Sequence, residues 1–266
     1  VDVAGVIFNK VGGPRHVEIL EQAMARIAPD TRVFGVLPRN DDLQLPSRHL
    51  GLVQAREHNN LETFLDKAAA WVGEHLDIAA MRRTMRPWPV RPKSDAPVLI
   101  PPLGQRIAVA KDDAFAFAYS ATIDGWRAAG AEISFFSPLT NQAPDVRADA
   151  IYLPGGYPEL YAGRLAANWD FLEGLQQAAD KLKAIFGECG GYMVLGHGLT
   201  DADGRRHPMA CLLPLETSFA ARKIHIGYRR AVPAKAGPLG GRPPRFRGPE
   251  FPFAPVVQAG DRERAG

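Results

Sequence analysis

Six prolines that fall close together divide this chain into two parts. They are Pro87, Pro89, Pro92, Pro97, Pro101 and Pro102. Proline has no backbone N–H and a fixed φ angle, so a segment this rich in proline forms neither a helix nor a central strand. We therefore expect a first unit at residues 1–81, a linker at residues 82–104 and a second unit at residues 105–230. Seven further prolines punctuate residues 231–266, where we expect irregular structure.

Both units alternate between strand-like and helix-like segments. Apolar runs of strand length occur at residues 3–8, 33–37, 106–110, 133–136 and 150–153, and another run enters Cys189. Apolar residues recur at helical spacing at residues 15–28, 60–76, 114–129 and 168–181. The helix at 114–129 is expected to turn inward Phe115, Tyr119, Ile123 and Trp126. This alternation predicts an α/β fold with a mostly parallel sheet, in which functional groups gather at the carboxyl ends of the strands.

A cysteine follows one of these apolar runs, in the segment Gly187-Glu188-Cys189-Gly190-Gly191. Gly-x-Cys-x-Gly has the spacing of a nucleophile elbow, in which small residues allow the sharp turn that lifts a nucleophile off the sheet. The helix that follows would favour the thiolate of Cys189. The backbone N–H of Gly190 would point at an oxyanion forming beside the sulfur. The alternative is a buried, inert cysteine, which the paired glycines and the preceding strand disfavour.

Composition limits the partners of the chain. With 46% apolar and 23% charged residues, it has the composition of a globular protein. We find neither an apolar run of transmembrane length nor a secretory signal, and we expect no membrane partner. Two cysteines, Cys189 and Cys211, make neither a disulfide framework nor a zinc site. We therefore expect a cytoplasmic location and no metal site. The net charge of +3, without a recognised binding module, argues against nucleic acid as a partner.

A cysteine nucleophile needs a general base, usually histidine. The chain offers His197, His207 and His225 after the cysteine. We expect His197 to continue the helix after Cys189 and to point away from the sulfur. His207 lies in a polar turn and His225 in an apolar segment. Each is better interpreted as a surface or core histidine, so these residues do not identify the base.

Several motifs of this chain occur in a specific combination. They are Phe-Phe-Ser-Pro-Leu at residues 135–139, Leu-Pro-Gly-Gly-Tyr-Pro-Glu-Leu at 153–160 and Gly-Glu-Cys-Gly-Gly at 187–191. This set resembles the glutaminase domain of the cobyrinic (or hydrogenobyrinic) acid a,c-diamide synthase family. In the first unit, residues 5–11 and 46–53 resemble the end of that family's ATP-dependent synthetase domain. The resemblance covers residues 1–75 and 105–258 in the same order.

The resemblance implies a glutamine-dependent and ATP-dependent amidoligase of cobalamin biosynthesis. Its fold would be a partial nucleotide-binding α/β synthetase domain followed by a flavodoxin-like glutaminase domain. Cys189 would attack the side-chain amide of glutamine, and the backbone N–H groups of Gly156 and Gly190 would stabilise the oxyanion. Ammonia would pass to the synthetase domain, where ATP and Mg²⁺ activate the a- and c-carboxylates of a corrinoid substrate.

The resemblance also implies roles for residues of the first unit. Asn9 matches the position that reads the adenine of ATP, and Arg48 and His49 would face the corrinoid. Each has a structural alternative: Asn9 could cap the helix near residue 14, and Arg48 and His49 could be turn residues at the edge of the domain.

The chain departs from the family pattern in three places. It contains no phosphate-binding loop of the Gly-x-x-x-x-Gly-Lys type, which the family carries nearer its N-terminus. The family's Gly-His-Glu-Phe-His-Tyr element reads Gly-Pro-Glu-Phe-Pro-Phe at residues 248–253. The family's catalytic histidine would fall beyond Gly266. Together with a start that is not methionine, this predicts a fragment or a degenerate copy, inactive by itself, whose partner is a missing N-terminal synthetase segment.

Other functions remain open. Within the enzymes, the chain could be a glutaminase of the cobyric acid synthase type or another cysteine hydrolase on a flavodoxin-like fold. From a different class, it could be a non-catalytic remnant that only binds a partner. A phosphate-binding loop encoded directly upstream would favour the enzyme.

Overall fold

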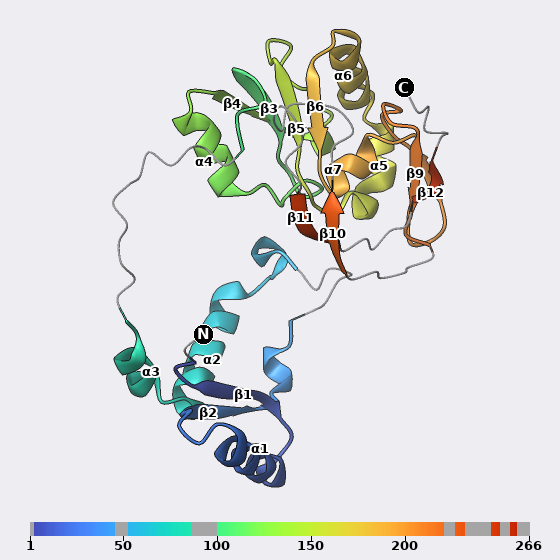
Figure 1. The fold of residues 1–266 in the computed structure, drawn as a ribbon. Helices are drawn as coiled ribbons and strands as arrows, with labels where there is room; N and C mark the ends of the chain where they lie inside the picture. Colours follow the sequence, from blue (N-terminus) through green and yellow to red (C-terminus); the bar gives the residue numbers. More distant parts are fainter. Residues whose placement is uncertain are drawn as a thin grey trace. The chain divides into compact units, whose positions relative to one another are not determined.

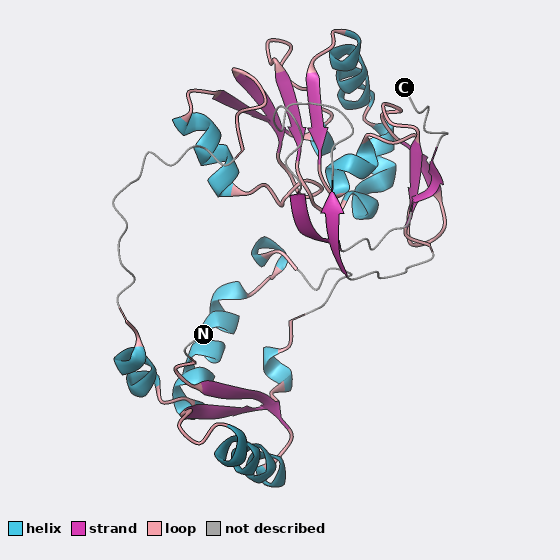
Figure 2. Cartoon of the chain, in the orientation of Figure 1, coloured by secondary structure: helices cyan, strands magenta, loops and turns pink. Residues whose placement is uncertain are grey.

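The computed structural model describes residues 3–45, 53–86, 100–220, 227–231, 246–250 and 256–259. The chain divides into two compact units, Val1–Ser94 and Asp95–Gly266, which run from blue to teal and from green to red in Figure 1. The boundary between the units lies within the proline-rich stretch 82–104. Strands alternate with helices in both units (Figure 2), as an α/β fold requires. Within the described residues, no helix combines the length and apolar character that a membrane span needs.

The first unit contains two parallel strands with helices beside them. Strand β1 (Val6–Val11) pairs with β2 (Val33–Pro38). The helices are α1 (Pro14–Ile27), α2 (Leu61–His75) and α3 (Ile78–Thr84), with short 3-10 turns η1 (Asp41–Leu43) and η2 (Ala55–Glu57). Helix α1 begins at a proline, whose missing N–H costs nothing in the first helical turn. Strand β1 starts later than the run at 3–8 and extends through Asn9 to Val11.

The second unit is built on a four-stranded parallel sheet. Its strands are β3 (Arg106–Ala110), β4 (Glu132–Phe136), β5 (Ala150–Leu153) and β6 (Ala184–Gly187), in the order β4-β3-β5-β6. Its helices are α4 (Ser120–Ala128), α5 (Ala162–Ala167), α6 (Trp169–Asp180) and α7 (Gly190–Val194), and its 3-10 turns are η3 (Pro138–Thr140) and η4 (Pro158–Tyr161).

Alternate residues of the central strands β3 and β5 enter two different cores. Ile107 and Tyr152 pack on one face of the sheet with Trp126 of α4. Ile151 and Leu153 pack on the other face with Phe171 of α6 and other apolar side chains. Because both faces are covered, these strands are nearly uniform apolar runs instead of alternating ones. The predicted parallel sheet with helices on both sides is therefore confirmed.

The structure differs from the helix expected at residues 114–129. Helix α4 begins only at Ser120, because residues 111–118 form a loop at the carboxyl end of β3. Phe115, Ile123 and Trp126 are buried as expected, whereas Tyr119 is 63% exposed. The early aromatic residues therefore belong to the loop and not to the helix face.

A second sheet contains strands from the late part of the chain. Strands β7 (Gly198–Thr200), β8 (Arg206–Pro208), β9 (Leu215–Ser218) and β12 (Val256–Ala259) pair in the order β12-β9-β7-β8. A separate antiparallel pair joins β10 (Gly227–Ala231) and β11 (Phe246–Glu250). Strands β11 and β12 lie where we expected irregular structure. Pro249 stands opposite Tyr228 in a two-stranded ladder, where each strand has a free edge that tolerates a missing N–H.

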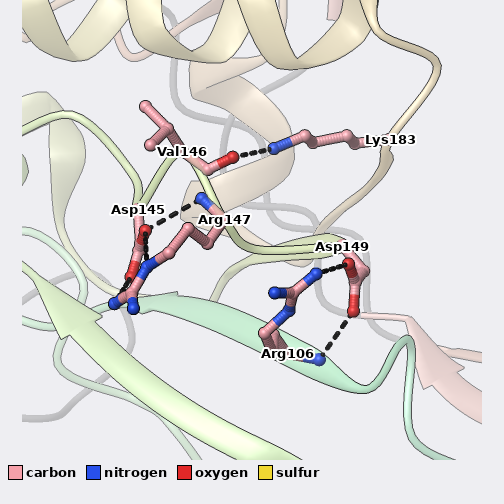
Figure 3. A network of polar contacts seen from close by, with 6 residues as sticks. All are labelled: Arg106, Asp145, Val146, Arg147, Asp149 and Lys183. Carbon is pink, nitrogen blue, oxygen red and sulfur yellow. Dashed lines mark hydrogen bonds and ion pairs between the residues drawn. The ribbon is translucent and has the colours of Figure 1, made fainter.

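A polar network ties the amino ends of the parallel strands together, as Figure 3 shows. Its members are Arg106, Asp145, Val146, Arg147, Asp149 and Lys183. The backbone N–H and the guanidinium of Arg106 both donate to Asp149, at 3.0 and 2.9 Å. Lys183 Nζ donates to the Val146 carbonyl at 2.7 Å. These contacts fix the strand ends that lie opposite the carboxyl edge of the sheet.

Candidate active site

Cys189 lies at the carboxyl end of β6 and caps the start of α7 in a strained conformation. Its φ of 50° and ψ of −113° fall in a region that residues with a side chain rarely adopt. The glycines on either side make the turn possible. A Cβ on Gly191 would lie 2.0 Å from the Leu153 carbonyl oxygen, and one on Gly187 would lie 2.8 Å from the Gly191 carbonyl carbon. The elbow therefore packs directly on β5 and exposes the cysteine.

The loop after β5 brings Gly156 next to Gly190, the residue that follows Cys189 at the start of α7. An ideal Cβ on Gly155 would lie 3.3 Å from Cys189 Cβ, and one on Gly190 would lie 3.2 Å from the Gly156 nitrogen. The backbone N–H groups of Gly190 and Gly156 both donate hydrogen bonds to the Cys189 thiol. Two N–H groups that converge beside a nucleophile form the arrangement that stabilises a tetrahedral oxyanion.

The surroundings of Cys189 favour the protonated thiol over the thiolate. Although Cys189 as a whole residue is exposed, neighbouring atoms partly desolvate its sulfur and raise the pKa of Cys189, and the negative charges of Glu188 and Glu159 raise it further. The N–H groups of Gly190 and Gly156 act in the opposite direction and do not compensate. The N–H of Gly190, the first residue of α7, lowers the pKa as expected for a helix start, but desolvation and the two carboxylates raise it by more. To act as a nucleophile, the Cys189 thiol would therefore need a base.

Glu188, directly before the cysteine, is held by a buried tyrosine. Tyr152 donates its hydroxyl hydrogen to the Glu188 carboxylate. The Tyr152 ring is 1% exposed and lies between Trp126 and Phe186, at centroid distances of 5.4 and 5.7 Å. Desolvation raises the pKa of Glu188, which the Tyr152 hydrogen bond partly offsets. No local pattern predicts this pair, because the contact between Tyr152 and Glu188 depends on the pairing of β5 with β6.

The described histidines that follow Cys189 do not supply an evident base. His207 is 7% exposed, and its Nε2 lies 2.7 Å from Asp201 Oδ2 in the turn between β7 and β8. Its ring is also close to Gly163 of α5, so it is a buried structural histidine and not a turn residue on the surface. His197 does not continue the helix, because α7 ends at Val194, and it is exposed just before β7. His225 lies outside the described residues.

The predicted residues of the first unit are only partly described. Asn9 is exposed on β1, opposite Leu37 of β2. Arg48 and His49 lie outside the described residues, as do most of the predicted linker and residues 251–253 of the altered family element. The described part of the chain contains no group of three metal-ligating side chains.

Sequence reasoning missed the loop at residues 111–118, which forms one wall of the site. The Phe117 N–H donates to the Gly155 carbonyl at 2.9 Å, and the Phe117 ring meets Tyr157 edge-on at 5.1 Å. A Cβ on Gly156 would lie 2.0 Å from the Ala114 carbonyl oxygen. The available signal was Asp112, a polar residue two positions after the end of a buried strand.

Comparison with known families identifies two matching regions. Residues 106–251 match the CobB/CobQ-like glutamine amidotransferase domain. Residues 1–53 match the CobQ/CobB/MinD/ParA nucleotide binding domain. Each match falls in one of the two units.

Curated relatives match along almost the whole chain. A hydrogenobyrinate a,c-diamide synthase from Sinorhizobium sp is 51% identical over 99% of this chain and 60% of its own length. Proteins with the same name from Brucella abortus and Rhodobacter capsulatus are 52% and 46% identical, over 59% and 58% of their lengths. The chain thus spans about 60% of the length of these relatives.

Two solved structures share a more distant likeness. One, described as a glutamine amidotransferase, is 16% identical with a TM-score of 0.40, covering 58% of this chain and 75% of its own. The other, PurLQS from Thermotoga maritima, is 18% identical with a TM-score of 0.36, covering 59% of this chain and 71% of its own.

Proposed function

Because the chain belongs to the CobB/CobQ-like glutamine amidotransferase family, we propose that Cys189 attacks the side-chain amide of glutamine. The observation that carries this proposal is the strained Cys189 with two backbone N–H groups, those of Gly156 and Gly190, donating to its sulfur. Such donors cost no reorganisation when negative charge develops on the carbonyl oxygen. The site is therefore suited to acyl transfer through a tetrahedral intermediate.

In the proposed reaction, a general base removes the thiol proton and a bond forms between Cys189 Sγ and the amide carbon. The carbonyl electron pair moves onto oxygen, where the two N–H groups stabilise it. The intermediate collapses, the C–N bond breaks, and the nitrogen takes a proton and leaves as ammonia. Water then attacks the γ-glutamyl thioester, releases glutamate and restores the thiol. We infer that the base is a histidine outside the described residues, either His225 or one beyond Gly266.

For the whole protein, we propose amidation of the a- and c-carboxylates of a corrinoid with the ammonia released at Cys189. The names of the relatives favour hydrogenobyrinate over its cobalt-bound counterpart. The nucleotide-binding match at residues 1–53 supports ATP as the activating cofactor, and ATP with Mg²⁺ would supply phosphoryl activation of the carboxylates. Asn9 remains our candidate for the adenine contact, and Arg48 and His49 for the corrinoid.

The domain boundaries and surroundings of this activity are also proposals. We propose a synthetase part at residues 1–81, a linker at 82–104 and a glutaminase part from residue 105. We propose that an N-terminal segment completes the synthetase part, in line with the 60% of a relative's length that this chain covers. We place the whole protein in the cytoplasm, where its glutamine and ATP are available.

The test uses a substrate that needs no general acid. The γ-glutamyl ester of 4-nitrophenol releases nitrophenolate, a leaving group that departs without a proton, once Cys189 has attacked. We expect a burst of nitrophenolate equal to one per chain, which persists in Cys211→Ala and disappears in Cys189→Ala. A burst that survives Cys189→Ala would overturn the assignment of the nucleophile. With glutamine itself, the leaving nitrogen needs a proton donor, so a chain whose histidine lies beyond Gly266 should release little ammonia, and robust Cys189-dependent release would assign this role to His225.

A further inference from the structure

A single carboxylate joins the loops that follow β3 and β4. Asp112 Oδ1 accepts a hydrogen bond from the Ala114 N–H at 2.9 Å. Its other oxygen, Oδ2, accepts from the Ser137 hydroxyl at 2.9 Å and from the Leu139 N–H at 2.8 Å. Charge-assisted hydrogen bonds of this kind are stronger than those between neutral groups. Asp112 therefore fixes the position of Ala114 relative to the 3-10 turn η3.

The residues that Asp112 fixes pack directly against Gly155 and Gly156, in the loop after β5. The Ala114 carbonyl oxygen lies where a Cβ of Gly156 would be, at 2.0 Å from its ideal position, and Phe115 Cα lies 3.0 Å from the same point. Ala114 and Phe115 are both fully buried, so they cannot move outward into solvent to relieve a close contact with Gly156. The Phe117 N–H also donates to the Gly155 carbonyl at 2.9 Å. The peptide that presents the Gly156 N–H is thus held by the loop that Asp112 anchors.

From this chain of contacts we infer that Asp112 is a positioning residue for the oxyanion pocket. It does not touch the substrate; it sets the place of the Gly156 N–H through Ala114. The inference rests on the proposed function, because it assumes that Gly156 stabilises an oxyanion next to Cys189. A displacement of about 1 Å at a reacting centre is enough to cost about a hundredfold in rate, so the anchor matters even at a distance from the sulfur.

The substitution Asp112→Asn tests this inference with little change in volume. An asparagine turns one oxygen into an NH₂ group, which then faces either the Ala114 N–H or the donors of Ser137 and Leu139. In either orientation, a hydrogen bond that Asp112 accepts from one of the two loops is lost. Two rates are measured on each protein: acylation of Cys189 by the γ-glutamyl nitrophenyl ester, and alkylation of the same thiol by iodoacetamide. Alkylation forms no oxyanion, so it reports the thiol alone.

We expect Asp112→Asn to lower the acylation rate by at least about tenfold while alkylation stays within about twofold. The matched control is Asp124→Asn, which removes an exposed carboxylate of α4 that pairs with Arg127 at 3.3 Å. Both rates should be unchanged in this control. Equal losses of acylation and alkylation in Asp112→Asn would indicate a general structural role and would overturn the inference, as would two unchanged rates.

A second variant keeps the test decisive if Asp112→Asn does not fold. Ser137→Ala removes the hydrogen bond from the Ser137 hydroxyl to Asp112 and should lower the ratio of acylation to alkylation by a smaller factor than Asp112→Asn does. An unchanged ratio in Ser137→Ala would then contradict the inference. Failure of the proposed function looks different: the wild-type chain itself would show no acylation that depends on Cys189.

Discussion

At Gly156, a single added methyl group should slow acylation of Cys189 while leaving the reactivity of its thiol almost unchanged. In Gly156→Ala, the new Cβ would lie 2.0 Å from the Ala114 carbonyl oxygen and 2.7 Å from its carbon. Ordinary contacts begin at 3.4 Å, so the two backbones must separate by about 1.4 Å (3.4 minus 2.0). Neither partner is the free end of a flexible side chain. The loop that carries the Gly156 N–H must therefore move.

The size of this movement sets the expected effects. Overpacking of a buried contact costs about 1–3 kcal/mol of unfolding free energy, which lowers the melting temperature by roughly 2–12 °C for a unit of this size. Loss of one oxyanion donor slows acyl transfer by about 10²–10³-fold. The thiol keeps its neighbours Glu188 and Gly190, so its reaction with iodoacetamide should change by only a few-fold, on the order of 1 kcal/mol or less.

The assay compares burst acylation by the γ-glutamyl nitrophenyl ester with iodoacetamide alkylation, at a temperature well below the melting transition. The control is Gly163→Ala in α5, where the nearest atom to a new Cβ is His207 Cε1 at an ordinary 3.4 Å. That change should stabilise the protein by about 0.5–1 kcal/mol, because alanine loses less entropy in a helix. Acylation of a folded Gly156→Ala at the wild-type rate would refute the oxyanion role of Gly156.

Three further predictions concern stability. Desolvation raises the pKa of Glu188 above its ordinary value of 4.5, so the folded state loses stability as the pH rises from 4.5 through the folded pKa and the carboxyl ionises. Glu188→Gln stays neutral and should therefore become more stable than wild type above pH 4.5 in urea unfolding. Equal pH profiles of stability for the two proteins would contradict this. The hydrogen bond with Arg106 lowers the pKa of Asp149 from 3.8, so Asp149→Asn should cost a small amount of stability above pH 3.8. This loss should become smaller in high salt, and also as the pH falls through the folded pKa. A large loss that does not depend on salt would argue against an exposed pair. Calorimetry should show separate transitions for the two units, and one cooperative transition would count against their independence.

The sequence predicted those parts of the fold that depend on local pattern. Strands β3 and β5 are buried apolar runs that end before a lysine and a proline, and β6 is a partly buried apolar run that ends in glycine. The Cys189 turn was predictable for a similar reason, because the glycines that permit it lie within two residues of the cysteine. Its tight packing on Leu153 follows once β5 and β6 pair.

Features that depend on distant contacts were not predictable. Residues 114–119 carry aromatic residues at helical spacing, yet the Asp112 carboxylate captures the Ala114 N–H and holds a loop there. The raised pKa of Cys189 comes from burial and from Glu159, which lies on a different loop. The strands at residues 246–250 and 256–259 depend on partners in β10 and β9, whereas the local abundance of proline indicated the opposite.

The central claim is that Cys189 forms a γ-glutamyl thioester, and mass spectrometry tests it most directly. The chain is mixed with the γ-glutamyl nitrophenyl ester, quenched in acid within the burst, and digested for peptide mapping. We predict one γ-glutamyl group on the peptide that contains Cys189, removable by hydroxylamine, present in Cys211→Ala and absent in Cys189→Ala. A label on Cys211 instead, or no label on a folded chain, would contradict the account.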